Sequence, residues 1–473
     1  MSQWIGIAML AGVALGAIVT GLPVWGVLIS LATLGAAASV ALDATTAALL
    51  AALPSRIVGL LESDLLQALP LFVFMGALLN RLPLARILFR AALRPFGGAR
   101  GATLALGAIL GPMNGSVSAN AIALTRAIEP ALAEREVAPA ESIALLTVAS
   151  TLGVLVPPSL VLILLGDAMM AAHTIALNTT GRADRIINTQ DIFRGAMLPA
   201  ALFLAACLAF AFLRREAGRR LLAPSWTEAA LALLTVGFIG GLLVGVALGY
   251  FYAVEAAAMG AVGLLAAGLL SRRLDMATLK AALDDTLSMT GALMALLVAA
   301  TTFTLVFRVL GSDRLVAGWM DAVPGGAPGI LGAGLGLIFL AAFVLDAFEI
   351  IFVLVPILLP PILMRVEDAQ WVAVLTLLVL QTSFLLPPLG YALTMTRAAA
   401  TRRAPLRAAM AALAPFILVQ LCVTAVVFCW PNLAHLGRAP APPVAAPSEA
   451  DVTRRLGEIA PPADLLEIAP PKF

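Results

Sequence analysis

The sequence predicts an all-α polytopic membrane protein built on an inverted-topology repeat, with two re-entrant helical hairpins and two broken helices. Three observations lead to this fold class. The chain is 62% hydrophobic and 12% charged, with a mean hydropathy of +1.03, whereas soluble domains average about 45–50% apolar and about 25% charged residues. Apolar runs of about 20 residues, the length that crosses a bilayer, recur along the chain. Helix breakers interrupt such runs at related positions in the two halves.

The related positions define an internal repeat. A shift of 230 residues places Ser116 on Asp346 and Pro130 on Pro360, and it superimposes two Pro-Pro pairs. We therefore expect two halves that each contain one hairpin and one broken helix. The expected first half is 1–222, with its hairpin at about 103–128 and its broken helix at about 142–170. The expected second half is 223–430, with the hairpin at about 330–360 and the broken helix at about 371–396.

Local sequence explains each interruption. The apolar segments on either side of residues 111–115 are each too short to cross the hydrocarbon, so a hairpin that enters and returns is expected. The Pro-Pro pairs at 157–158 and 387–388 must break their helices, because proline lacks a backbone donor and clashes with the preceding turn. The Pro- and Ala-rich tail, 431–473, is expected to be disordered.

Basic clusters predict the orientation of the chain. Clusters rich in arginine occur at 81–100, 214–220, 272–280 and 397–407. The positive-inside tendency places all four in the cytoplasm, and the two hairpins then enter from opposite faces. Such an inverted repeat is typical of secondary transporters.

The breaks are candidate binding sites. Unpaired backbone groups at membrane depth persist only where protein buries them or where they line a watery cavity. Half-helix N-termini attract anions, and unwound carbonyls coordinate sodium. Tight helix packing is the alternative role for the small residues, and capping is the alternative role for Asp346. The candidate substrate-binding residues are Asn114, Ser116, Ser118, Ser159, Asp346, Thr382, Ser383 and Tyr391.

The order and spacing of these motifs resemble the large membrane subunit of the TRAP (tripartite ATP-independent periplasmic) transporters. The resemblance runs from about residue 16 to 415. It rests on residues 20–24 (Thr-Gly-Leu-Pro-Val), 69–76 (Leu-Pro-Leu-Phe-Val-Phe-Met-Gly), 113–119 (Met-Asn-Gly-Ser-Val-Ser-Ala), 151–159 (Thr-Leu-Gly-Val-Leu-Val-Pro-Pro-Ser), 254–258 (Val-Glu-Ala-Ala-Ala), 343–346 (Phe-Val-Leu-Asp), 355–360 (Val-Pro-Ile-Leu-Leu-Pro) and 387–390 (Pro-Pro-Leu-Gly).

The resemblance implies an elevator-type importer of the ion-transporter superfamily in the bacterial inner membrane, coupled to sodium. The implied partners are a small TRAP membrane subunit and a periplasmic substrate-binding protein, and the implied substrate is a small organic anion with a carboxylate. The first sodium site carries over to Asn114, Ser116, Gly153, Val156 and Pro158. The second carries over to Ala342, Asp346, Thr382 and Leu386. Leu386 stands where the family has threonine, which removes one hydroxyl oxygen from the second site.

Other function classes fit less well. A net charge of +2 gives no basic surface for nucleic acid. No nucleophile–base pair, metal-ligand spacing or phosphate loop is found, so neither an enzyme nor a cofactor is expected. A stand-alone ion-coupled carrier or antiporter of the same superfamily is the alternative function.

Overall fold

The computed structural model describes residues 2–41, 52–62, 64–113, 116–157, 159–213, 225–386 and 390–435. These ranges contain helices and turns but no strand. Nine helices in them are long and apolar enough to cross a membrane, which confirms the all-α polytopic class. They are α1 (Ser2–Thr20), α2 (Val24–Ala41), α10 (Leu160–Thr180), α11 (Thr189–Leu213), α12 (Trp226–Leu248), α13 (Ala253–Leu270), α14 (Met276–Val309), the combined segment Ala347–Arg365, and α21 (Leu406–Cys429).

The first hairpin and the first broken helix follow one another. The hairpin consists of α7 (Ala99–Leu110), the short 3-10 helix η1 (Gly111–Met113) and α8 (Val117–Glu134). The broken helix consists of α9 (Pro139–Leu155) and α10. Proline suits the first turn of α9, because its missing N–H is not needed there.

The second half repeats this arrangement. Its hairpin consists of α16 (Gly326–Ala341), α17 (Ala347–Glu349), the π-helix η2 (Ile350–Leu354) and α18 (Val355–Arg365). Its broken helix consists of α19 (Ala369–Leu385) and α20 (Tyr391–Ala399).

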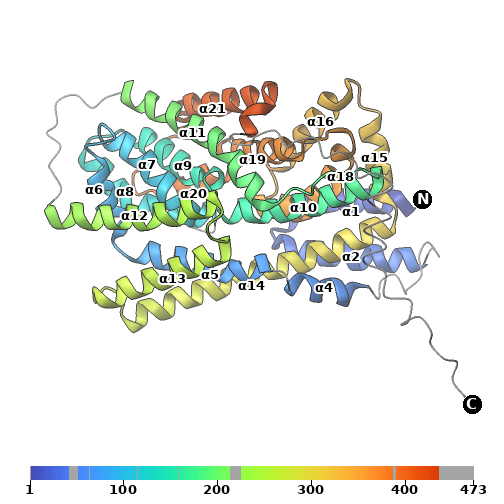
Figure 1. Ribbon diagram of the computed structural model, residues 1–473, viewed down its shortest axis with the longest axis horizontal. Helices are drawn as coiled ribbons and strands as arrows, with labels where there is room; N and C mark the ends of the chain where they lie inside the picture. The colour runs from blue at the N-terminus through green and yellow to red at the C-terminus, as the bar shows by residue number, and fades with distance from the viewer. Residues whose placement is uncertain are drawn as a thin grey trace, which may run out of the picture. The chain divides into compact units, whose positions relative to one another are not determined.

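Helix boundaries confirm the internal repeat. Helices α9 and α19 begin and end 230 residues apart, as do the first residues of α8 and α17. Figure 1 shows the two hairpins at opposite ends of the helices, with α7 and α8 on the left and α16 and α18 on the right. Helices α9 and α10 run from left to right, and α19 and α20 run in reverse. The repeat is therefore inverted.

The two halves interlock, and residues Met1–Leu436 form one compact unit. The second arm of each hairpin packs against the second part of the other half's broken helix, so that α8 contacts α20 and α18 contacts α10. We call the two hairpins and the two broken helices the repeat core. The predicted boundary between the halves, at residues 222 and 223, falls outside the described residues.

A buried carboxylate joins the halves at the end of the first hairpin. Glu129 on α8 is 2% exposed. It accepts hydrogen bonds from the backbone N–H of Thr401 (2.8 Å), the hydroxyl of Thr401 (3.0 Å) and the backbone N–H of Arg402 (2.8 Å). These donors satisfy the charge of Glu129 and fix α8 to the loop between α20 and α21.

Four further helices form a layer beneath the repeat core. Helix α5 (Asp64–Arg81) contacts α13 and α14, and α14 contacts α2; the four helices lie toward the lower edge of Figure 1, and we call them the base layer. Gly260 on α13 lies so close to α5 that an added Cβ would meet the sulfur of Met75 at 2.3 Å. Beyond Arg81 the chain bends by 71° into α6 (Leu84–Ala92).

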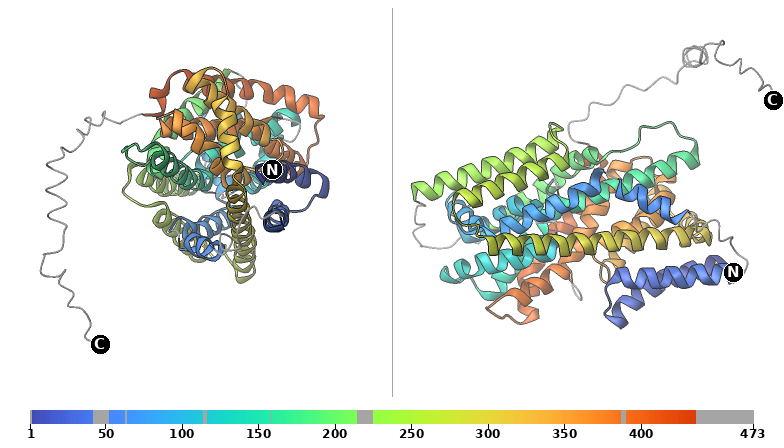
Figure 2. Two further views of the ribbon diagram at one scale, coloured as in Figure 1. Left: turned by 90° about the vertical axis from the view of Figure 1, so that its right-hand side faces the viewer. Right: turned by 90° about the horizontal axis from the view of Figure 1, so that it is seen from below.

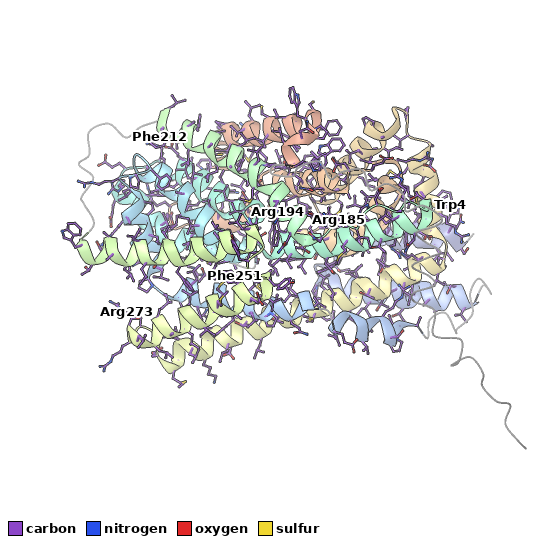
Figure 3. The ribbon with its side chains drawn as sticks, in the orientation of Figure 1. Trp4, Arg185, Arg194, Phe212, Phe251 and Arg273 are labelled. Atoms are coloured by element: carbon purple, nitrogen blue, oxygen red, sulfur yellow. The ribbon has the colours of Figure 1, made fainter. Side chains whose placement is uncertain are left out.

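The remaining helices connect or flank these parts. Helices α12 and α13 lie side by side, as Figure 2 shows. Helix α12 begins with a capping box in which the Ser225 hydroxyl accepts from the N–H of Glu228. The short helices α4 (Leu53–Leu61) and α15 (Ser312–Asp321) complete the fold. Trp319 on α15 packs against Trp4 with ring centroids 5.9 Å apart, at the end of the helices where Figure 3 shows Trp4.

The prediction of a disordered tail, 431–473, is wrong for its first five residues. Residues Pro431–Ala434 form the 3-10 helix η3. The carbonyl of Ala434 accepts from Gln370 at 2.6 Å, and His435 lies 2.6 Å from the carboxylate of Asp368. These contacts tie residues 431–435 to the start of α19, and residues 436–473 lie outside the described ranges.

Candidate functional site

The tip of the first hairpin touches the end of α9 through backbone atoms. An added Cβ on Gly111 would lie 2.7 Å from the Cα of Gly153, and one on Gly153 would lie 2.4 Å from the carbonyl oxygen of Gly111. One turn earlier, a Cβ on Gly107 would lie 2.3 Å from the carbonyl oxygen of Ala149. Glycine is therefore required, and carbonyl groups of both segments come close together at this point.

A small cavity lies beside this contact. Its volume is about 10 Å³, which suits one water molecule or one small ion. Its polar and glycine lining residues are Gly111, Ser116, Ser150, Gly153 and Ser159. Hydroxyl and carbonyl oxygens are the ligands that hard cations prefer, so the lining has the chemistry of a sodium site.

The hydroxyl groups around this cavity retain lone pairs for a cation. Ser150 Oγ donates to the carbonyl of Thr147 (2.7 Å), and Ser159 Oγ donates to the carbonyl of Val154 (3.2 Å). Ser159 Oγ also accepts from the N–H of Leu162 (3.2 Å), which uses one of its two lone pairs. Ser116 and Ser118 share one hydrogen bond at 2.7 Å. A hydroxyl that donates its single hydrogen still has oxygen lone pairs that face elsewhere.

The structure thus places two residues of the predicted first sodium site, Ser116 and Gly153, on one cavity. Val156 is half-buried and is the C-cap that follows α9. Asn114 and Pro158, which complete the predicted set, lie outside the described residues. Sequence reasoning missed Ser150. Its position three residues before Gly153 puts both on one helix face, and this spacing was the available signal.

The tip of the second hairpin carries two carboxylates. Asp346 Oδ1 accepts from the N–H of Ala347 (2.7 Å), and Glu349 Oε2 accepts from the N–H of Asp346 (2.9 Å). Both carboxylates therefore cap α17. Capping is the alternative role that the sequence predicts for Asp346. Both residues remain half-buried, so capping does not hide them completely.

Tyr391 connects the two hairpin tips. Its hydroxyl interacts with the side chain of Ser118 from the first hairpin. The carboxylates of Asp346 and Glu349, from the second hairpin, are its charged neighbours. Four residues from three interrupted segments thus lie near one another, and three of them belong to the predicted substrate-binding set.

The other residues of the predicted second sodium site are buried in α19 or flank it. Thr382 Oγ1 donates to the carbonyl of Leu378 (2.7 Å). Its neighbour Ser383, which is predicted to bind substrate and not sodium, donates from Oγ to the carbonyl of Leu380 (2.6 Å). Ala342 is the buried C-cap of α16, and α16 packs against α19. Leu386 follows the last residue of α19 with an apolar side chain.

A second, larger cavity of about 680 Å³ lies between α8 and the base layer. Ser116 lines this cavity as well as the small one. Ser116, the N-cap of α8, therefore lies between a cavity the size of an ion and a cavity large enough for a small solute. Volumes of about 300–1,000 Å³ are usual for small-molecule sites.

The apolar bundle contains two interrupted hairpins and two interrupted helices, and these enclose carbonyl groups, hydroxyls and cavities. This arrangement defines a membrane carrier of the secondary-transporter class. The chain belongs to the family "Tripartite ATP-independent periplasmic transporter, DctM component", which matches residues 7–433. It is a large permease component of a TRAP transporter and a multi-pass protein of the bacterial inner membrane. The family is one of transporter components and not of enzymes.

Relatives and solved structures agree with this assignment. The ectoine/5-hydroxyectoine TRAP transporter large permease UehC of Ruegeria pomeroyi is 24% identical over 380 residues, which are 78% of this chain and 85% of that protein. The C4-dicarboxylate TRAP transporter large permease DctM of Rhodobacter capsulatus is 24% identical over 359 residues, 70% of this chain and 77% of that protein. The crystal structure of the Alcanivorax borkumensis YdaH transporter has the same fold, with a TM-score of 0.59 and 15% identity over 80% of this chain and 87% of that one.

Proposed function

We propose that this permease imports a small organic anion with a carboxylate and that sodium drives the import. A periplasmic substrate-binding protein delivers the anion, and a small TRAP membrane subunit completes the complex. The names of the two relatives give a C4-dicarboxylate and ectoine as solutes, and both of these molecules carry a carboxylate. No cofactor other than the coupling ion is needed.

The observation that carries this proposal is the position of Ser116 between the two cavities. A cation in the small cavity contacts one face of the hairpin tip. The other face of the same tip lines the large cavity. Sodium therefore favours one conformation of the tip, and the solute binds to that conformation more tightly. Coupling of this kind requires that each ligand prefers the same state of a shared element.

An elevator movement fits the arrangement of the helices. In this proposal the repeat core moves as one body against the base layer, because the two halves of the core interlock through the α8–α20 and α18–α10 contacts. The large cavity lies between α8 on one side and α5 and α14 on the other, so this boundary leaves space for movement.

Uptake into reconstituted vesicles tests the proposal. The permease, its small subunit and its binding protein are reconstituted together, and uptake of labelled succinate is measured with sodium or potassium outside. We expect uptake only with an inward sodium gradient and with the binding protein present. Equal uptake with potassium would refute sodium coupling. Equal uptake without the binding protein would instead identify the chain as a stand-alone carrier.

A further inference from the structure

The large cavity has a strongly cationic wall. Arg81 at the end of α5, Arg86 on α6 and Arg126 on α8 line it, together with a single carboxylate, Asp285 on α14. The net charge of these four residues is +2. The cavity extends from Ser116 to the exposed side chains of Arg86 and Arg126, so it connects the hairpin tip to the surface.

Within the described part of the chain, one of the three arginines has a carboxylate partner. Arg81 Nη2 donates to Asp285 Oδ2 (2.7 Å) and to the carbonyl of Ala281 (2.9 Å). Its side chain is 22% exposed, and it fastens α5 to α14. Among the described residues, Arg86 and Arg126 have no ion-pair partner within 4.0 Å. Two cations, one on α6 and one on α8, are therefore available to a ligand in the cavity.

The inner end of the cavity also favours negative charge. Helix α8 begins there, and the hydroxyl of its N-cap, Ser116, bonds to Ser118 instead of capping the helix. The first N–H groups of α8 therefore receive no cap from the Ser116 side chain, and the helix dipole places partial positive charge at this end. The positive groups form a path from the tip of the hairpin to Arg126.

We infer that Arg86 and Arg126 contact the carboxylate of the transported anion in this cavity and select solutes with net negative charge. The inference rests on the proposed function, because the anion is the transported solute. A dicarboxylate gains from both arginines, whereas ectoine is a zwitterion whose own cation opposes the contact. A cleft lined by one sign of charge raises the local concentration of oppositely charged ligands and their association rates by about 10–1,000-fold.

Thiol labelling measures the charge of the cavity without transport. Ala123 lines the cavity and is replaced by cysteine in a chain whose Cys207, Cys422 and Cys429 are replaced by serine. The full-length protein is solubilised in detergent. Methanethiosulfonates of opposite charge, one bearing a sulfonate and one a trimethylammonium group, are then compared at low ionic strength. We expect the anionic reagent to react about ten times faster relative to its rate on free cysteine.

Charge variants show which residues cause this difference. Arg86→Gln with Arg126→Gln is expected to reduce the preference for the anionic reagent to about one, whereas Arg126→Lys in the otherwise unchanged chain is expected to preserve most of it. Arg94→Gln is the matched control, because Arg94 lies near α6 but does not line the cavity. An unchanged preference in the double variant, or an equal loss in Arg94→Gln, would overturn the inference. Melting temperatures of the purified variants confirm that each one is folded.

Solute protection tests the choice of ligand. Succinate is expected to slow labelling of the introduced cysteine in the protein that keeps Arg86 and Arg126. In the variant with both arginines replaced, succinate should no longer slow labelling. Ectoine is expected to protect the cysteine less than succinate at the same concentration. Equal protection by ectoine would overturn the selection of net anions. The labelling needs neither sodium nor a binding protein. Labelling that depends on the arginines, without sodium-driven uptake, would therefore refute only the proposed coupling. Sodium-driven uptake, without labelling that depends on the arginines, would refute only this inference.

Discussion

Individual residues at the first hairpin tip have roles that the sequence predicts to different degrees. Ser116 and Gly153 follow from the broken segments and the family motifs, and the structure places both on the small cavity. Ser150 was missed because its helix is uninterrupted there, and its spacing of three residues from Gly153 was the available signal. Arg126 lies three turns along α8 from the tip, and only the tertiary structure brings it to the same cavity as Ser116.

At this scale, Ser116→Ala is expected to raise the sodium concentration for half-maximal uptake by about tenfold, equivalent to about 1.4 kcal/mol. The change removes one oxygen ligand at a depth where water replaces it poorly. Uptake titrated with sodium at saturating binding protein measures the effect. Thr125→Ala is the control, since the Thr125 hydroxyl donates to Ala121 within α8 and does not line the small cavity. An unchanged sodium curve for Ser116→Ala would show that the tip has a packing role only.

Helices and their interruptions were the most predictable elements. Both Pro-Pro pairs follow the ends of α9 and α19 closely, since Leu155 and Leu385 are the last helical residues. The hairpin arms extend a few residues beyond the predicted 103–128 and 330–360, to 99–134 and 326–365. Helix α15, which has the amphipathic pattern of a short surface helix, was not predicted.

The contact between η1 and α9 gives a prediction at the scale of elements. Gly153→Ala is expected to lower the stability of the protein by about 1–3 kcal/mol, because its methyl group must displace the Gly111 backbone. It is also expected to abolish sodium-dependent uptake by widening the small cavity.

Melting temperature and uptake are the measurements for Gly153→Ala. Gly237→Ala is the matched control: Gly237 lies inside α12 with no atom within 4 Å of an added Cβ, so alanine there is neutral or stabilising by up to about 1 kcal/mol. Wild-type stability and uptake in Gly153→Ala would mean that the backbone contact is not required.

For the molecule as a whole, the inverted repeat was predictable because two Pro-Pro pairs and two hairpin tips share one offset of 230 residues. The packing between the halves was not. Nothing in either half's sequence indicates that α8 pairs with α20, because such contacts depend on the shapes of surfaces that are far apart in the chain. The same limit applies to the buried position of Glu129.

The distribution of basic residues predicts the orientation of the whole molecule. Figure 3 shows Phe212, which precedes the 214–220 cluster, and Arg273 toward the same end of the helices, the end at which Figure 1 shows α6. We expect this end to face the cytoplasm, because basic segments resist translocation. The turn after α15 lies toward the other end and is expected to face the periplasm.

Cysteine labelling in intact cells measures this orientation. In the background without native cysteines, an impermeant reagent should label Ala322→Cys, in the turn after α15, but should leave Arg273→Cys unlabelled until the cells are opened. Labelling of Arg273→Cys from outside would reverse the predicted orientation. Equal labelling after cell lysis is the control for thiol reactivity.

The bond between Glu129 and Thr401 also limits how the protein can be made. The two residues are 272 positions apart. At about 5–20 residues per second, the ribosome adds Thr401 roughly 14–54 s after Glu129. During that interval the carboxylate lacks its native donors, and an uncompensated buried charge is destabilising by about 3–5 kcal/mol. The first hairpin therefore reaches its final position only when synthesis is nearly complete, and a chain that terminates early gives an incomplete fold instead of a smaller working carrier.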